Sequence, residues 1–80
     1  MQPERIKTLI EGGLEGAQAF VDGDGRHFQA LVICEAFAGK RAVQQQQMVY
    51  RALGDEMRDE AIHALSLRTL TPEEYAQQGH

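Results

Sequence analysis

The sequence is short of the residues that cross-link small proteins and of the apolar runs that membranes require. Among its 80 residues there is one cysteine, Cys34, so one chain can form neither an internal disulfide nor an all-cysteine metal site. Charged residues interrupt the N-terminal segment at Glu4, Arg5 and Lys7, so it lacks the apolar centre of a signal peptide. No run approaches the roughly 18 apolar residues of a membrane span. These absences predict a protein of the reducing cytoplasm.

Positive charge is also scarce, with 8 Lys and Arg against 12 Asp and Glu and a net charge of −4. This balance argues against non-specific binding to nucleic acid or anionic membrane as the main activity. A chain of 80 residues is enough for one domain, whose core we place within residues 2–78. No nucleophile–base pair, phosphate loop or paired-carboxylate site stands out, so the sequence does not predict an enzyme.

The first half of the chain predicts one helix and a strand hairpin. Met1–Gly12 has apolar residues at helical spacing, with a proline near its start and glycine at its end. Ala17–Asp22 and Phe28–Cys34 are predicted strands, the second being the clearer because aromatic and branched residues fill it. The Asp-Gly-Asp-Gly segment at 22–25 is typical of a turn. The two strands are therefore expected to pair antiparallel.

The second half predicts a longer helix over Arg41–Arg58. Gly54 interrupts it, so one bent helix and two short helices both remain open. The helical period suggests one apolar stripe, made of Val43, Gln47, Tyr50, Leu53 and Met57.

A third strand is predicted over Ile62–Leu67, and a last helix runs to about Gln78. Thr71, Pro72 and Glu74 form a strong start signal for this helix: an N-cap, a proline at the first position, and the partner residue of a capping box. The order is α-β-β-α(α)-β-α, an α/β chain of the α+β kind in one small domain.

The two histidines nearest the strands are predicted to lie at one edge of the sheet. A helical connection lets the second and third strands run parallel with a right-handed crossover. Parallel strands begin at the same end of a sheet. His27 lies just before the second strand and His63 near the start of the third. Both imidazoles are therefore candidates to meet there, as metal ligands or as ordinary surface and core-edge histidines.

Four segments of the chain form an ordered set of motifs. They are Gly25-Arg26-His27-Phe28, Phe37-Ala38-Gly39-Lys40, Gln47-Met48-Val49-Tyr50, and Ile62–Leu67 with Thr71–Tyr75. Together they resemble the BolA family, and within it the IbaG type. The resemblance runs from about Ile6 to Tyr75, and the ordered set is more specific than any single motif. It implies a fold similar to the class II KH arrangement, with a three-stranded mixed sheet and helices.

The resemblance implies a partnership with monothiol glutaredoxins of the CGFS type. In such heterodimers a [2Fe–2S] cluster is shared between glutaredoxin, glutathione and the BolA-like protein. The family's C-terminal histidine ligand corresponds to His63, and its loop ligand, a His or Cys before the second strand, corresponds to His27. A role in iron–sulfur cluster trafficking, iron or redox sensing, or the stress response is then expected. No cofactor is expected in the isolated chain.

The alternative function is a nucleic-acid-binding transcriptional regulator that uses the KH-like or helix-turn-helix region. Lys40, Arg41 and Arg51 are its candidate contacts. Many BolA-like members carry Arg-His-Arg where this chain has glutamines at 45–47, so the resemblance weakens this alternative at the helix that would contact DNA.

Three further features do not predict sites. Gly13–Gly16 matches the GxxG clamp of KH domains, but it precedes the first strand and carries Glu15 in place of a cation. A calcium loop that began at Asp22 would need Glu at its twelfth position, where Ile33 stands. Cys34 lies late in an apolar strand, which predicts a buried and inert thiol.

Overall fold

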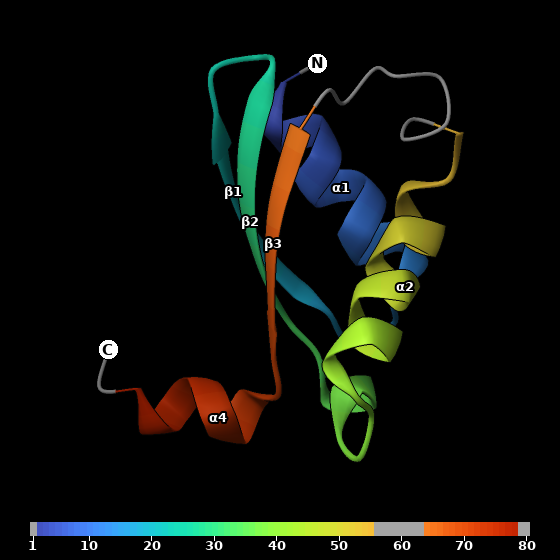
Figure 1. Cartoon of the computed structure of the whole chain (residues 1–80), viewed down its shortest axis with the longest axis vertical. Coiled ribbons are helices and arrows are strands. Elements are labelled where there is room, and N and C mark those ends of the chain that lie inside the picture. Colours follow the sequence, from blue (N-terminus) through green and yellow to red (C-terminus); the bar gives the residue numbers. More distant parts are fainter. Residues whose placement is uncertain (1, 56–63, 79–80) are drawn as a thin grey trace.

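The computed structural model describes residues 2–55 and 64–78 (Figure 1). These residues confirm the α+β class. A short 3-10 helix, η1, follows β2, and the remaining elements match the order predicted from the sequence. The elements are α1 (Pro3–Gly13), β1 (Gln18–Gly23), β2 (His27–Ile33), η1 (Glu35–Phe37), α2 (Ala42–Leu53), β3 (Ala64–Leu70) and α4 (Pro72–Gln77).

The three strands form one mixed sheet in the order β1-β2-β3. β1 pairs antiparallel with β2, so the predicted hairpin is confirmed. β2 pairs parallel with β3, as the helical connection between them requires. Strand boundaries differ from the predicted ones by one to three residues: β2 begins at His27 instead of Phe28, and β3 continues to Leu70.

Alternation along β2 separates a buried face from an exposed one. Phe28, Ala30 and Val32 are buried, whereas the alternate residues His27 and Gln29 are exposed. The helices α1 and α2 lie on the buried face of the sheet, to its right in Figure 1. The core cluster joins both helices, the sheet and η1, and consists of Ile6, Ile10, Ala19, Phe28, Val32, Cys34, Phe37, Val49 and Leu53.

The opposite face of the sheet has no long helix over it in the described part of the chain. Phe20, Leu31 and Arg68 share one row across the three strands on this face, and Phe20 remains 46% exposed. The short helix α4 lies on this side, at the lower left of Figure 1. Its Tyr75 ring stacks against Phe20, with ring centroids 6.1 Å apart. This stack connects the C-terminal helix to the open face.

The predicted apolar stripe of the long helix is wrong in part. Its Leu53 is buried as predicted, but Val43 is 61% and Tyr50 38% exposed, and the other buried residue of α2 is Val49, which the stripe left out. The helix has apolar residues on two sides, and packing against α1 and the sheet selects one of them. α2 ends at Leu53, where Gly54 takes φ = +57°. The stripe's last residue, Met57, lies outside the described residues.

The GxxG segment has a packing role at its first glycine and a turn role at its last. A Cβ on Gly13 would lie 2.7 Å from the Cβ of Ala52, so glycine here allows α1 to approach α2 closely. Gly16 has φ = +78°, a conformation that favours glycine. These two requirements account for both glycines of the segment without a nucleic-acid ligand.

The start signal of the last helix is confirmed. The backbone N–H of Glu74 donates to the Thr71 hydroxyl oxygen at 3.2 Å, and the Glu74 carboxylate accepts from the Thr71 N–H at 2.8 Å. This reciprocal pair satisfies two backbone N–H donors at the N-terminus of α4. None of the helices within residues 2–55 and 64–78 combines the length and the apolar character needed to cross a membrane.

Candidate metal-ligand site

His27 stands where the two parallel strands begin. It is the first residue of β2, and its register partner on β3 is Ala64, the first residue of that strand. The Ala64 N–H donates to the Arg26 carbonyl at 3.2 Å, which ties the start of β3 to the loop before His27. We call this region, made of Asp24, Arg26, His27 and Ala64, the histidine end of the β2–β3 pair.

The other predicted ligand, His63, lies outside the described residues. In the sequence it directly precedes Ala64. The structure therefore confirms the parallel arrangement and the shared starting edge of the two strands. The meeting of the two imidazoles stays a prediction.

Asp24 holds the loop that presents His27. Its carboxylate Oδ1 accepts the backbone N–H of His27 at 2.8 Å and that of Arg26 at 2.9 Å. These hydrogen bonds, that of His27 first, lower the pKa of Asp24 below its ordinary value. The other carboxylate oxygen lies 3.8 Å from Nδ1 of His27, close enough to attract a protonated ring. Our sequence analysis missed this role of Asp24, although Asp before Gly is a common sign of such a side-chain turn.

The His27 side chain is 74% exposed, so its ring is open to a partner molecule. Beside it lies a shallow pocket of about 300 Å³. Asp22, Asp24, His27 and Ala64 contribute to its wall, together with Gln29 and Ser66 of the open sheet face. An exposed imidazole in a shallow, carboxylate-bearing depression can be a metal ligand when other ligands come from outside the chain.

The opposite end of the same strands carries the single cysteine. Cys34 follows β2, is 1% exposed, and donates its backbone N–H to the Leu70 carbonyl at 3.0 Å. Its Sγ donates to the Glu15 carbonyl at 3.6 Å. We call Cys34, Leu70 and Glu15 the cysteine end. The predicted burial of this thiol is confirmed. Cys34 follows His27 by seven positions along the strand, about 23 Å in extended chain.

Comparison with known proteins decides the family. Residues 5–74 match the sequence profile described as "BolA-like protein". The chain belongs to the BolA-like family. It is 37% identical over 76 residues to the "Acid stress protein IbaG" of Escherichia coli K12, covering 95% of this chain and 90% of the relative.

A solved BolA homologue from Coxiella burnetii shares the fold of this BolA-like chain with a TM-score of 0.87. The two are 44% identical, and the match covers 95% of this chain and 97% of the other. A third relative, from Vibrio cholerae, is named "DNA-binding transcriptional regulator BolA". It is 36% identical over 76 residues, which cover 95% of this chain and 68% of the relative. The resemblance to the BolA family is thus confirmed.

The candidate nucleic-acid contacts of this BolA-like chain are exposed but do not converge. Lys40 and Arg41 precede α2, whereas Arg51 lies in its last turn. Arg51 follows Arg41 by ten positions, about 15 Å along the helix axis. Lys40 shares its surface depression with Glu35, Glu73 and Glu74, whose carboxylates offset its charge.

The described part of this BolA-like chain does not gather a complete ligand set. Within residues 2–55 and 64–78, no three side chains of His, Cys, Asp or Glu lie together as a metal site. At the histidine end, His27 and Asp24 lie 3.8 Å apart and form a pair only. A metal centre at the histidine end thus needs donors beyond these residues.

Proposed function

We propose that this BolA-like protein is a partner of a monothiol CGFS-type glutaredoxin and that the pair shares one [2Fe–2S] cluster. His63 and His27 are the ligands that this chain supplies, and glutaredoxin and glutathione supply thiolates. The observation that carries the proposal is the register pair His27↔Ala64, because His63 directly precedes Ala64 in the sequence. Family membership supports the proposal through the resemblance described above.

The donor count favours sharing over a cluster held by one chain. A [2Fe–2S] cluster takes four ligands from its surroundings, and in its commonest form these are cysteine thiolates. Here the single cysteine is buried at the cysteine end, far from His27. Two imidazoles from this chain and two thiolates from the partner side complete the set. Neutral imidazole in place of thiolate makes the cluster less negative and raises its reduction potential, as in Rieske centres.

The Asp24 carboxylate supports this assignment from outside the ligand set. Metal-bound histidines commonly use their second ring nitrogen to donate to a carboxylate or carbonyl. Asp24 lies 3.8 Å from Nδ1 of His27, on a loop that its own hydrogen bonds hold in place. In the complex Nδ1–H of His27 would donate to Asp24, and Nε2 would bind iron. Asp24 is thus a positioning residue for the loop ligand.

The test is reconstitution under anaerobic conditions. This protein is mixed with a CGFS-type glutaredoxin, glutathione, iron and sulfide, and the complex is separated by size-exclusion chromatography with visible absorption detection. We expect a heterodimer with one cluster and a spectrum that differs from that of glutaredoxin alone. Failure to form a complex, both with and without cluster, would contradict the proposal.

DNA-binding regulation is the second candidate, and the name of the Vibrio cholerae relative favours it. The separated cations, the glutamines at 45–47 and the net charge of −4 oppose it. A salt titration of binding to duplex DNA distinguishes the two functions, because phosphate contacts give a steep loss of affinity with salt. We expect weak, sequence-independent binding at physiological salt. A sub-micromolar, sequence-selective affinity would favour the regulator instead.

A further inference from the structure

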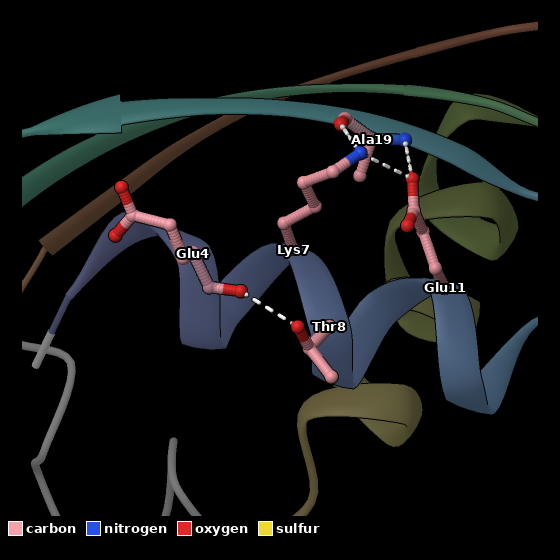
Figure 2. A network of polar contacts seen from close by, with 5 residues as sticks. All are labelled: Glu4, Lys7, Thr8, Glu11 and Ala19. Carbon is pink, nitrogen blue, oxygen red and sulfur yellow. Dashed lines mark hydrogen bonds and ion pairs between the residues drawn. The ribbon is translucent and has the colours of Figure 1, made fainter.

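The two edges of the sheet differ in how their outward backbone groups are satisfied. At the β1 edge, α1 reaches across with two side chains (Figure 2). The Ala19 N–H donates to the Glu11 carboxylate at 2.9 Å, and the Ala19 carbonyl accepts from Lys7 Nζ at 3.0 Å. Lys7 and Glu11 also pair with each other at 2.7 Å. Together with the Lys7 contact, the Ala19 N–H holds the pKa of Glu11 below its ordinary value. This edge is closed to another strand at Ala19.

The β3 edge has no comparable cover in the described part of the chain. The Ala64 N–H and the Leu70 carbonyl both form hydrogen bonds toward β2. In a parallel pair every second residue does so, which here means Ala64, Ser66, Arg68 and Leu70. The backbone groups of Leu65, Leu67 and Thr69 must then point away from β2. Among residues 2–55 and 64–78, none of these outward N–H and C=O groups is hydrogen-bonded. In Figure 1 the strand stands at the front of the sheet.

The composition of β3 leaves this edge available for pairing. Natural edge strands usually carry proline, lysine, an inward charge or a bulge that prevents association. The strand Ala-Leu-Ser-Leu-Arg-Thr-Leu has none of these, and its one charged residue, Arg68, lies on the open face of the sheet. Leu65 and Leu67 are only partly buried against the core.

We propose that the β3 edge pairs with the β3 edge of a second copy of this chain, giving a reversible homodimer with a continuous six-stranded sheet. With a two-fold axis at Leu67, the middle residue of β3, the two β3 strands run antiparallel and pair over their whole length. The outward groups of Leu67 then bond to those of the copy's Leu67, and those of Leu65 to Thr69. About six hydrogen bonds result. Arg68 then lies opposite the copy's Ser66. An axis at Arg68 would instead place two like charges opposite each other.

The exposed flank of α2 favours a second copy over an isolated peptide. The contact between Gly13 and Ala52 shows which side of α2 faces α1. With about 100° per residue, Val43 and Tyr50 lie on the flank opposite Ala52, on the side of the β3 edge. These are two of the three large apolar side chains exposed among the described residues. In the two-fold dimer the two α2 flanks approach each other and these side chains become covered.

Charge also favours a contact between identical copies at this place. Two chains of net charge −4 repel each other unless the surfaces that meet are neutral or complementary. The α2 flank carries no charge at Val43, Gln46, Gln47 and Tyr50, and it carries no carboxylate at these positions. Arg51 lies beside Gln47 and Tyr50 in one depression, and β3 contributes the Arg68 guanidinium. The β1 side, by contrast, presents the Lys7–Glu11 pair.

Sedimentation of the full chain from micromolar to millimolar concentration tests the proposal. We expect a monomer–dimer equilibrium that Ser66→Lys weakens about tenfold, because each lysine faces the copy's Arg68. Ser66→Glu should tighten it by a similar factor. Gln29→Lys is the matched control: Gln29 is the register partner of Ser66 on the same face, one strand away from the edge, and should have little effect.

Two further measurements identify the interface. Val43→Lys should also weaken the dimer, because the α2 flank takes part in it. Amide exchange at Leu65, Leu67 and Thr69 should slow as concentration rises, whereas Ser66 and Arg68 should be protected throughout. A chain that stays monomeric at millimolar concentration would overturn the proposal. A dimer that ignores both Ser66→Lys and Val43→Lys would overturn it as well.

Discussion

The two ends of the β2–β3 pair have the same backbone pattern and opposite chemistry. At the histidine end an imidazole is 74% exposed on a loop held by a carboxylate. At the cysteine end the thiol is 1% exposed and contacts only a backbone carbonyl among the polar groups described. A thiolate is intrinsically the stronger ligand for iron–sulfur clusters. Because the Cys34 thiol is buried, it is not accessible to a metal bound at the surface, whereas the His27 imidazole is. Accessibility, more than ligand strength, therefore selects the candidate site.

The largest effect should come from His63→Ala in the complex with glutaredoxin. Mutation of a residue that hydrogen-bonds to a metal ligand typically lowers metal affinity by roughly 10- to 100-fold. Removal of a ligand itself should lower the affinity for the cluster by more than this. The visible spectrum should change, and the circular dichroism of the free chain should not. His80→Ala is the matched control, because it removes the third histidine of the sequence at its C-terminus. Equal effects of the two changes would contradict the assignment.

His27→Ala should have a smaller or partner-dependent effect on the same spectrum. The His27 ring is largely exposed, so water or a donor from the partner can take the vacated position. Cluster loss measured with several CGFS glutaredoxins should vary for His27→Ala and stay uniformly large for His63→Ala. A loss larger than that of His63→Ala would reverse the roles of the two histidines.

Asp24→Asn should weaken the presentation of His27 without removing a ligand. The pKa of Asp24 is lowered in the folded chain, so its stabilisation of the loop is complete above its ordinary value of 3.8. The stabilisation is lost as pH falls through the lower folded value. In the wild type, the amide signals of Arg26 and His27 should shift in that acidic range. In Asp24→Asn this titration should be absent, and the cluster should be lost a few-fold faster. An unchanged acid titration in the variant would exclude Asp24 as its cause.

Cys34→Ser should leave the cluster spectrum unchanged and lower the stability of the fold. The hydroxyl is more polar than the thiol at a buried position, so unfolding free energy should fall by about 1–3 kcal/mol. Urea unfolding of the free chain measures this loss, with Cys34→Ala as the apolar control. A cluster spectrum that changes in Cys34→Ser and stays the same in both histidine variants would place the ligand at the cysteine end instead.

Much of the fold could be predicted because local signals and packing agree. The branched run of β2 and the Thr71–Glu74 capping box formed as expected. The buried face of α2 was predicted only at Leu53, because Val43 and Val49 are equally apolar and the sequence does not say which of them faces the core. The choice between them depends on the close approach of Gly13 to Ala52, a tertiary contact. Terminal residues of strands also shifted, since hydrogen bonds between strands decide where pairing ends.

For the candidate site, sequence placed His27 and Cys34 at opposite ends of one strand, and the structure confirms this. The Asp24-Gly25 pair indicates a turn, but which N–H groups the Asp24 carboxylate accepts depends on the conformation of the loop, and this could not be predicted. The position of His63 relative to His27 is the remaining prediction, since only its neighbour Ala64 lies among the described residues.

The most direct test of the central claim is the detection of nitrogen bound to the cluster. This chain is labelled with ¹⁵N-histidine, combined with unlabelled CGFS glutaredoxin and glutathione, and the one-electron-reduced cluster is studied by pulsed electron paramagnetic resonance. We predict strong ¹⁵N couplings from histidine that diminish in His63→Ala and, to a smaller extent, in His27→Ala. A cluster-bearing complex without any ¹⁵N coupling would contradict ligation by this chain.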